Sequence, residues 1–389
     1  MSRRNRRRAA VLLVLALPVA AVLAWLARDA GRAFLARHAG AAASRPLRYA
    51  AAGGAAPPAS RCRWQRLWTW PAGAALPAAP APLDDGWIVA TQDGRLAALN
   101  AGGRVRWIQG FTNLAFATGA TQAGGVAVAV ADNGLVVAVR TADGQPLWRR
   151  QLAGAFRHAP LAWREGDAWR VALLSGADGV LTALDAADGR ERWTSPPTNR
   201  SDGAPATDGR RIAFGNCDAA VHVLDAATGE EAARVPVGAD AQMAGGVAWT
   251  GGRVCGGTRD GRLVAVDVAA GAIAWETNVA PAEAFVTPAV AGGLVVTGSR
   301  DGDVTAVDAA TGAARWRAQT EGGVDGLAAA DDAVFVNAAG VLHGLRLADG
   351  RAFCRLPVGD NVRGPAANGR EVVVGDDGGN VIGFGGQAP

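Results

Sequence analysis

The sequence of 389 residues contains no lysine, one tyrosine, four histidines and four cysteines, and these shortages exclude several kinds of active site. The histidines never occur in an H-x-E or H-E-x-x-H pattern, so zinc sites of those types are not expected. A Walker loop, a G-x-S-x-G turn and a paired-carboxylate motif are also missing, and the Asp-Gly pairs lack the ligand density of calcium loops. The sequence therefore predicts no metal site and no catalytic residue.

The positive charge of the chain is concentrated at its N-terminal end. The whole chain has 39 arginines and 35 acidic residues, a net charge of +4. Ten of these arginines and one acid precede Tyr49, which leaves 29 arginines against 34 acids, a net charge of −5, for the rest. Nucleic acid is not an expected partner, because phosphate binding usually needs a clustered basic face.

The first 27 residues have the pattern of a membrane segment. Five arginines within Met1 to Arg8 precede Ala9 to Ala27, an uncharged apolar run close to the ~20 residues that span a bilayer. We expect an uncleaved signal-anchor with a cytoplasmic N-terminus, because Arg28 and Asp29 follow the run at once. The alternative is a signal peptide cleaved after Ala24 and a secreted product. Residues 28–60, rich in Ala, Gly and Pro, are predicted to form a flexible tether.

Residues 61–389 consist of related repeats, of which Gly298 to Trp316 (GSRDGDVTAVDAATGAARW) is the clearest. Asp301 and Gly302 form a hairpin turn, a short strand follows, and a second turn ending at Gly312 leads into an outgoing strand. That strand ends in a tryptophan, for which we predict a structural docking role against the neighbouring repeat. The docking positions are Trp107, Trp148, Trp193, Trp275 and Trp316, with Ala233 and Cys354 replacing tryptophan in two copies.

The spacing of these positions predicts the fold. Successive steps of 41, 45, 40, 42, 41 and 38 residues, with several short strands each, are typical of a β-propeller with one blade per repeat. The last repeat stops at Gly385 without an outgoing strand. The segment Arg63 to Trp68 resembles the missing strand, with Trp64 or Trp68 at the docking position. We therefore predict one all-β domain of eight blades, in which residues 62–70 complete the blade formed by residues 363–385.

The repeats AVDAATGAARW and ALDAADGRERW resemble those of pyrroloquinoline-quinone-type propellers, and the resemblance extends over residues 62–385. The family includes quinone-dependent (PQQ) dehydrogenases and non-catalytic BamB-like outer-membrane assembly propellers. For a member of the enzyme group, the resemblance implies a pair of adjacent cysteines and calcium ligands. For a BamB-like protein, it implies a lipid-acceptor cysteine. No cysteines are adjacent here, no C-x-x-C-H haem signature occurs and no cysteine directly follows the apolar run. We therefore expect no cofactor; PQQ is not supported by the residues.

Four cysteines in an exported protein allow two disulfides. We predict the pairs Cys217–Cys255, from successive repeats, and Cys62–Cys354, which flank the closure of the ring. The alternative is that the cysteines are small buried apolar residues on strands, as the docking position of Cys354 suggests.

A second set of residues is expected to surround the mouth of the central channel. Nine or ten residues after each docking position the chain should reach the innermost strand of the next blade. One interpretation is a hydrated mouth, and the other is a ligand or peptide pocket on the axis. The candidate contacts are Arg157, His158, Asp202, Gln242, Glu283, Asp325, Asn361 and Arg363.

Three functions remain open at this point. The first is a non-catalytic, membrane-tethered propeller that acts as a scaffold or assembly factor for other envelope proteins, with the propeller monomeric on the periplasmic side of the inner membrane. The second is a PQQ-dependent oxidoreductase with an atypical site. The third is a ligand-sensing propeller.

Overall fold

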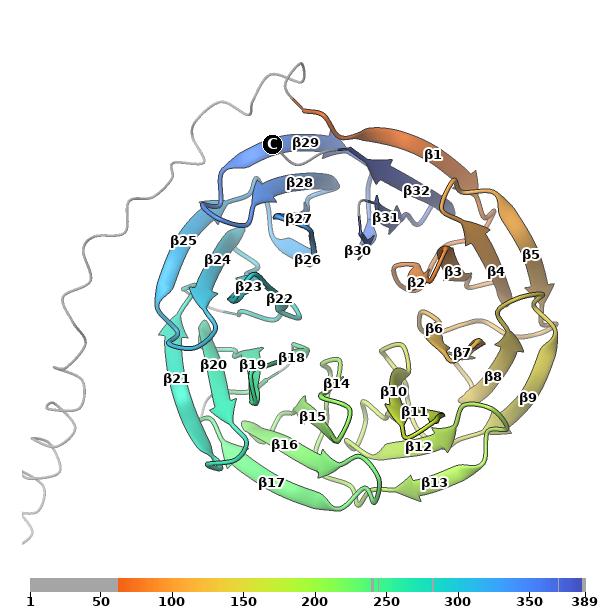
Figure 1. Cartoon of the computed structure of the whole chain (residues 1–389), viewed down its shortest axis with the longest axis horizontal. Coiled ribbons are helices and arrows are strands. Elements are labelled where there is room, and N and C mark those ends of the chain that lie inside the picture. Colours follow the sequence, from red (N-terminus) through yellow and green to blue (C-terminus); the bar gives the residue numbers. More distant parts are fainter. Residues whose placement is uncertain (1–61, 239–240, 244, 282, 370, 387–389) are drawn as a thin grey trace, which may run out of the picture. The chain divides into compact units, whose positions relative to one another are not determined.

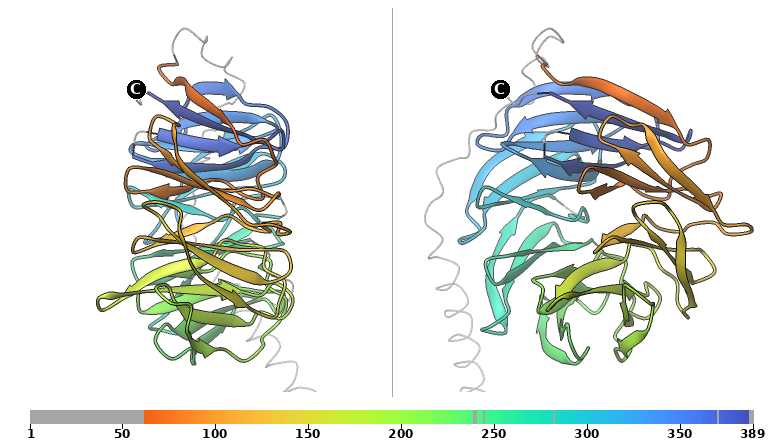
Figure 2. Two further views of the ribbon diagram at one scale, coloured as in Figure 1. Left: turned by 90° about the vertical axis from the view of Figure 1, so that its right-hand side faces the viewer. Right: turned by 45° about the vertical axis from the view of Figure 1, so that its right-hand side comes forward.

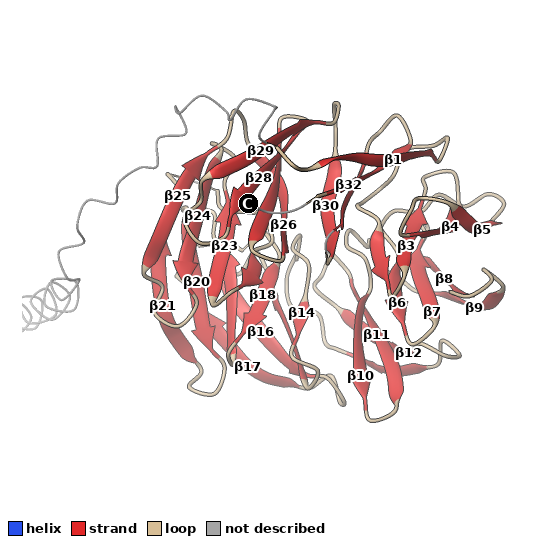
Figure 3. Ribbon diagram, turned by 45° about the horizontal axis from the view of Figure 1, so that its top comes forward, coloured by secondary structure: helices blue, strands red, loops and turns tan. Residues whose placement is uncertain are grey.

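The computed structural model describes residues 62–386 except positions 239, 240, 244, 282 and 370. Their 32 strands form eight four-stranded sheets, arranged as blades around a central axis (Figure 1). Figure 3 shows only strands and loops in this part of the chain. The predicted all-β, eight-bladed propeller is confirmed.

The predicted anchor and tether lie outside the described residues. Among the residues that are described, none belongs to a helix of the length and apolarity needed to span a membrane.

Each blade is an antiparallel sheet whose strands follow one another from the axis to the rim. The first four blades consist of β2 (Ala81–Leu83), β3 (Gly86–Ala90), β4 (Arg95–Asn100) and β5 (Val105–Gly110); β6 (Thr121–Ala123), β7 (Val126–Val130), β8 (Leu135–Arg140) and β9 (Pro146–Gln151); β10 (Leu161–Glu165), β11 (Ala168–Leu174), β12 (Leu181–Asp185) and β13 (Glu191–Thr194); and β14 (Ala206–Thr207), β15 (Arg211–Gly215), β16 (Ala220–Asp225) and β17 (Glu231–Pro236). The next three consist of β18 (Val247–Thr250), β19 (Arg253–Gly257), β20 (Arg262–Asp267) and β21 (Ala272–Asn278); β22 (Ala289–Ala291), β23 (Leu294–Gly298), β24 (Asp303–Asp308) and β25 (Ala314–Gln319); and β26 (Val324–Ala330), β27 (Ala333–Ala338), β28 (Val341–Arg346) and β29 (Ala352–Pro357).

The eighth blade joins the two ends of the described chain. It contains β30 (Arg363–Asn368), β31 (Glu371–Gly375), β32 (Asn380–Gly385) and, at the rim, β1 (Gln65–Pro71). Strand β1 runs antiparallel to β32, with Gln65 opposite Gly385, and both views in Figure 2 show the two strands side by side. The prediction that an N-terminal strand closes the ring is confirmed, and pairing within this blade leaves the ring without a break.

The runs of alanine and valine in the sequence form middle strands of the blades, where both faces of the sheet are buried. Strand β7 (VAVAV) is buried on both faces because its sheet lies between two neighbouring blades. Its alternate residues therefore enter different core clusters: Ala127 and Ala129 face the first blade, whereas Val128 and Val130 face the third. Small and β-branched side chains fit this narrow space between sheets.

Six rim tryptophans connect one blade to the next, at six of the eight junctions of the ring. Each indole N–H donates a hydrogen bond of 2.7 to 3.1 Å to a backbone carbonyl in the last turn of the following blade. A glycine in that turn lets the indole approach: Gly189 has a φ of +70°, and a Cβ there would lie 2.5 Å from the ring of Trp148. The six are Trp68, Trp107, Trp148, Trp193, Trp275 and Trp316.

The two docking positions without tryptophan lie at blade junctions that differ in structure. Opposite Ala233, the turn glycine Gly271 has no atom within 4 Å of a Cβ placed on it, so this junction lacks the tryptophan contact. Opposite Cys354 there is no turn at all, because β32 and β1 come from opposite ends of the chain. At that place Cys354 forms a disulfide with Cys62, with the two Cα atoms 4.8 Å apart.

The predicted pair Cys217–Cys255 is wrong, since both residues are free. Cys217 lies in the turn between β15 and β16 of the fourth blade, whereas Cys255 is fully buried in the fifth blade against Val295 and Val307 of the sixth. The Cys255 side chain thus points away from the blade that carries Cys217. Burial raises the pKa of the Cys255 thiol to about 12, so it is not a reactive thiolate.

Candidate functional site

The structure brings most of the predicted channel-mouth residues together. Two cavities of about 340 and 370 Å³ are lined by the segments that lead from one rim strand to the next innermost strand, and they share Asp325. Arg157 and Gln242 do not line these cavities. The six predicted residues that do are His158, Asp202, Glu283, Asp325, Asn361 and Arg363.

Asp202 is the most strongly engaged of these residues. Its carboxylate accepts a 2.7 Å hydrogen bond from Arg200 Nε and lies 3.4 Å from Arg157 Nε. Its backbone carbonyl is 2.5 Å from His158 Nε2. Burial lowers the pKa of His158, so at pH 7 the ring is neutral and donates from Nε2 to this carbonyl. The group therefore holds two successive blade connections together.

Other members of the set are also paired with neighbouring side chains. Glu283 Oε2 lies 3.2 Å from Arg300 Nε, and Asn361 donates a 2.6 Å hydrogen bond to Asp377. Gln242 accepts a 3.1 Å hydrogen bond from Arg259. Most polar side chains at the mouth are thus already paired with a neighbouring polar side chain.

Asp325 differs, because among the described residues it forms no ion pair within 4 Å. Burial raises its pKa, and the charge of Arg363 opposes that shift.

The mouth does not provide a site for a calcium-bound quinone. Within the described residues, no three His, Cys, Asp or Glu side chains are arranged to hold a metal ion. The carboxylates of Asp202 and Glu283, which line the cavity of about 340 Å³, are paired with arginines. The only disulfide among the described residues joins Cys62 to Cys354 on rim strand β29. It therefore does not correspond to the adjacent cysteines over the cofactor of the quinone enzymes. The donor set therefore does not fit the cofactor of the quinone enzymes.

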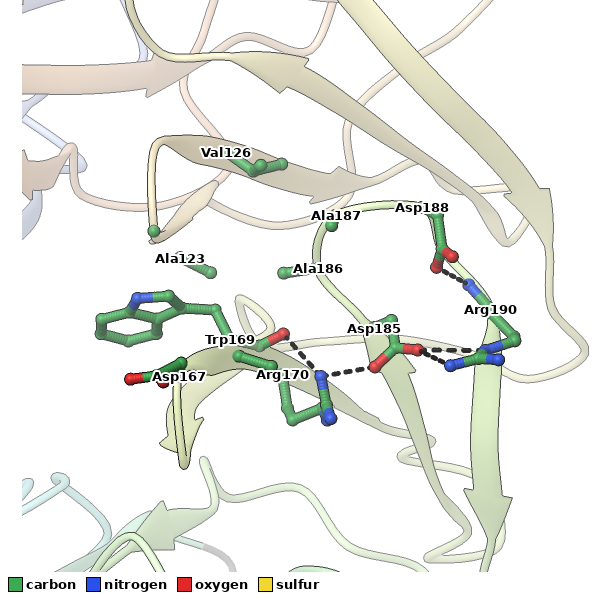
Figure 4. A pocket seen from close by; sticks show the side chains of 12 residues that line it. Ala123, Val126, Asp167, Trp169, Arg170, Asp185, Ala186, Ala187, Asp188 and Arg190 are labelled. Atoms are coloured by element: carbon green, nitrogen blue, oxygen red, sulfur yellow. Dashed lines mark hydrogen bonds and ion pairs between the residues drawn. The ribbon is translucent and has the colours of Figure 1, made fainter.

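A groove between the second and third blades was not predicted from the sequence. It has a volume of about 430 Å³ and contains the Trp169 indole, a floor of small residues including Ala123 and Ala186, and a charged wall (Figure 4). Trp169 is 36% exposed although it is a large apolar side chain. One edge of the indole packs over Gly124 of the second blade, where a Cβ would overlap the ring.

The charged wall of the groove is held in place by a network of ion pairs. Arg170 Nη1 lies 2.6 Å from Asp185 Oδ1 and Arg170 Nε 2.9 Å from Glu165 Oε2, while Arg190 Nη2 approaches the other Asp185 oxygen at 2.9 Å. The side chains of Arg170 and Asp185 are only 13% and 8% exposed. The groove is thus a preorganised surface with one exposed aromatic residue beside fixed charges.

One signal in the sequence points to this groove. The step from Trp148 to Trp193 is 45 residues, the longest in the array. The extra residues lie in the hairpin of β10 and β11, where β11 has seven residues and its counterparts β3 and β7 have five. This longer hairpin carries Trp169 at the start of β11.

The fold and its junctions define an eight-bladed propeller with tryptophan-docked repeats. The family described as outer membrane protein assembly factor BamB matches residues 63–168, 92–242 and 217–387. The chain belongs to this family of pyrroloquinoline-quinone-type repeat propellers.

Solved structures show the same fold at low sequence identity. BamB from Moraxella catarrhalis has a TM-score of 0.71 and 20% identity, covering 83% of this chain and 99% of that one. Quinohemoprotein alcohol dehydrogenase from Comamonas testosteroni has a TM-score of 0.66 and 14% identity, covering 85% and 78%. Sqt1 from Saccharomyces cerevisiae has a TM-score of 0.69 and 13% identity, covering 83% and 99%. No curated protein matches the sequence.

Proposed function

We propose that the chain is a non-catalytic, membrane-tethered propeller that binds other proteins of the cell envelope as a scaffold or assembly factor. The observation that carries the proposal is the preorganised groove around Trp169. Membership of the BamB family supports a role in envelope assembly. The apolar run Ala9 to Ala27 supports attachment to the inner membrane, with the propeller on the periplasmic side.

The groove has the properties of a binding hot spot, the small part of an interface that contributes most of the binding free energy. Tryptophan and arginine dominate such hot spots, where truncating one side chain typically costs about 2 kcal/mol or more of binding free energy. The Trp169 indole is already fixed over Gly124 and the arginines are already paired, so binding orders few further side chains. The small floor residues leave room for an apolar side chain of the partner against the indole.

Site-specific photocrosslinking in living cells of the native organism tests the proposal. A photoreactive amino acid replaces Ala187, which is exposed on the rim of the groove. The matched control carries it at Ala269, an exposed residue at the same place in the corresponding turn of the fifth blade.

We expect position 187 to give a discrete crosslink to an envelope protein that position 269 does not give, and W169A to abolish it. Equal crosslinking from both positions, or none from either while the protein is folded and in the membrane fraction, contradicts the proposal.

A further inference from the structure

The rim of the propeller is not uniform in its apolar exposure. Seven large apolar side chains are exposed among the described residues, and four of them lie on only three of the eight rim strands. These strands, β1, β5 and β9, are consecutive around the ring (Figure 1). The four residues are Leu67 (54% exposed), Val105 (42%), Ile108 (49%) and Leu147 (39%).

The same three strands are basic. Between them they contain four arginines and no acidic residue, whereas β13, β17 and β21 each contain a glutamate. Strands β25 and β29 also contain arginines and no acidic residue, but none of the seven exposed apolar residues lies on them. Two of the arginines, Arg106 and Arg150, pair with Asp85 and Glu191.

The other two, Arg66 and Arg149, have no carboxylate within 4 Å among the described residues, and Arg149 lies over the ring of Phe111. We call the four apolar residues together with Arg66 and Arg149 the β5 sector.

We infer that the β5 sector lies on the surface of an anionic lipid bilayer. Exposed aliphatic side chains flanked by arginines are the combination that binds the boundary between headgroups and acyl chains. Each arginine near an anionic membrane adds electrostatic attraction. The chain beyond Tyr49 has a net charge of −5, and the β5 sector is the side of the described ring where exposed apolar side chains and arginines occur together.

The position of the sector supports the bilayer as its occupant. This inference rests on the proposed membrane anchor, from which residues 28–60 lead to Cys62 and then β1. The predicted tether of 33 residues would have an r.m.s. span of roughly 30 Å. The rim strand that the tether reaches first is β1, which carries Leu67 and Arg66 of the sector.

Contact through the rim would fix the orientation of the propeller relative to the membrane. A ring that touches a plane with its rim keeps its axis parallel to that plane. The loop faces at both ends of the axis, including the Trp169 groove, would then be open to partners beside the propeller.

The test compares two positions that occupy the same place in their repeats. Val105 and Ile273 both stand two residues before a docking tryptophan, are 42% and 37% exposed, and lie on β5 and β21 at opposite sides of the ring (Figure 1). The full chain, with C217S and C255A to remove the free thiols, is labelled with an environment-sensitive fluorophore at V105C or I273C. It is reconstituted into phosphatidylethanolamine and phosphatidylglycerol vesicles that contain a headgroup nitroxide quencher.

We expect the quencher to remove most of the emission at position 105 and little at position 273. Phosphatidylcholine vesicles, or the R66E/R149E double variant, should reduce the quenching at position 105. If the chain floats with the vesicles and neither position is quenched, the inference is overturned while the anchor stands. If the chain does not float, anchor and inference both fail. Protection of position 105 only after an envelope protein is added would assign the sector to a protein partner and overturn the inference.

Discussion

Trp68 Nε1 donates a 2.6 Å hydrogen bond to Oε1 of Glu371, a residue 303 positions later in the chain, and shares this N–H with the Ala101 carbonyl at 3.0 Å. The other oxygen of the same carboxylate accepts a 2.8 Å hydrogen bond from Trp87 Nε1. Glu371 therefore joins the N-terminal strand β1, its own strand β31 and strand β3 of the first blade. At the closure of the ring, these two hydrogen bonds add to the pairing of β1 with β32.

Removing the carboxylate should weaken the closure. We expect E371A to lower the free energy of unfolding by about 1–3 kcal/mol, because the buried Trp87 indole N–H loses its acceptor. Chemical denaturation of the wild-type chain and the variant measures this difference. The control is E321A, which removes an exposed glutamate paired with Arg355 and should change stability little. Equal stability of wild type and E371A would contradict the role of Glu371.

The same residue should make closure dependent on pH. Burial raises the pKa of Glu371, and the two indole hydrogen bonds only partly oppose the shift. A carboxyl group with a raised pKa in the folded state stabilises the fold most below its unfolded pKa, and this stabilisation is lost as pH rises through the folded pKa. The difference in unfolding free energy between wild type and E371Q should therefore fall from pH 4 to pH 7. A difference that stays constant or grows over this range would contradict the assignment.

The turn glycines allow tryptophan docking to be separated from backbone strain. Gly189 and Gly271 have φ values of +70° and +62°, but only Gly189 is covered by an indole. An alanine at positive φ costs about 1–2 kcal/mol, so G271A should cost about that much. G189A should cost about 1–3 kcal/mol more, because its Cβ would overlap Trp148. Thermal and chemical unfolding of the two variants test this order, and equal losses would show that docking contributes nothing.

The disulfide at the closure should stabilise the protein through the unfolded chain. Cys62 and Cys354 are 292 residues apart, so the bond closes most of the propeller into one loop. We expect C62S to lower the free energy of unfolding by about 2–5 kcal/mol. C217S, which replaces a free thiol in a turn, should have little effect. If C62S and C217S unfold alike under oxidising conditions, the disulfide does not hold the ring closed.

The fold could be predicted from the sequence because its determinants are local and repeated. A tryptophan and a turn glycine recur in most blades, so their spacing defines the blade length without reference to tertiary structure. The choice between Trp64 and Trp68 could not be made, since both fit the pattern. The structure uses Trp68 for docking, while Trp64 packs 4.3 Å from the ring of Phe335 in the seventh blade.

The candidate site was predictable only in part, because side-chain direction is a tertiary property. Spacing located the channel mouth, yet it gave no indication that Asp202 pairs with Arg157 and Arg200. Spacing likewise placed Cys217 and Cys255 in successive repeats but did not reveal that Cys255 faces the sixth blade. The position of Trp169 in the groove is not predictable from its own repeat, because the indole packs over Gly124 in another blade.

The most direct test of the proposed interaction surface is the size of the native assembly. Wild type, W169A and I273A are expressed at native levels in the organism, extracted from the envelope with mild detergent and separated by size. Trp169 and Ile273 are exposed to the same degree, at 36% and 37%. We expect wild type and I273A to migrate together in an assembly larger than the single chain, and W169A to migrate alone as a folded protein. Retention of W169A in the larger assembly, or migration of the wild type as a single chain, would contradict the account.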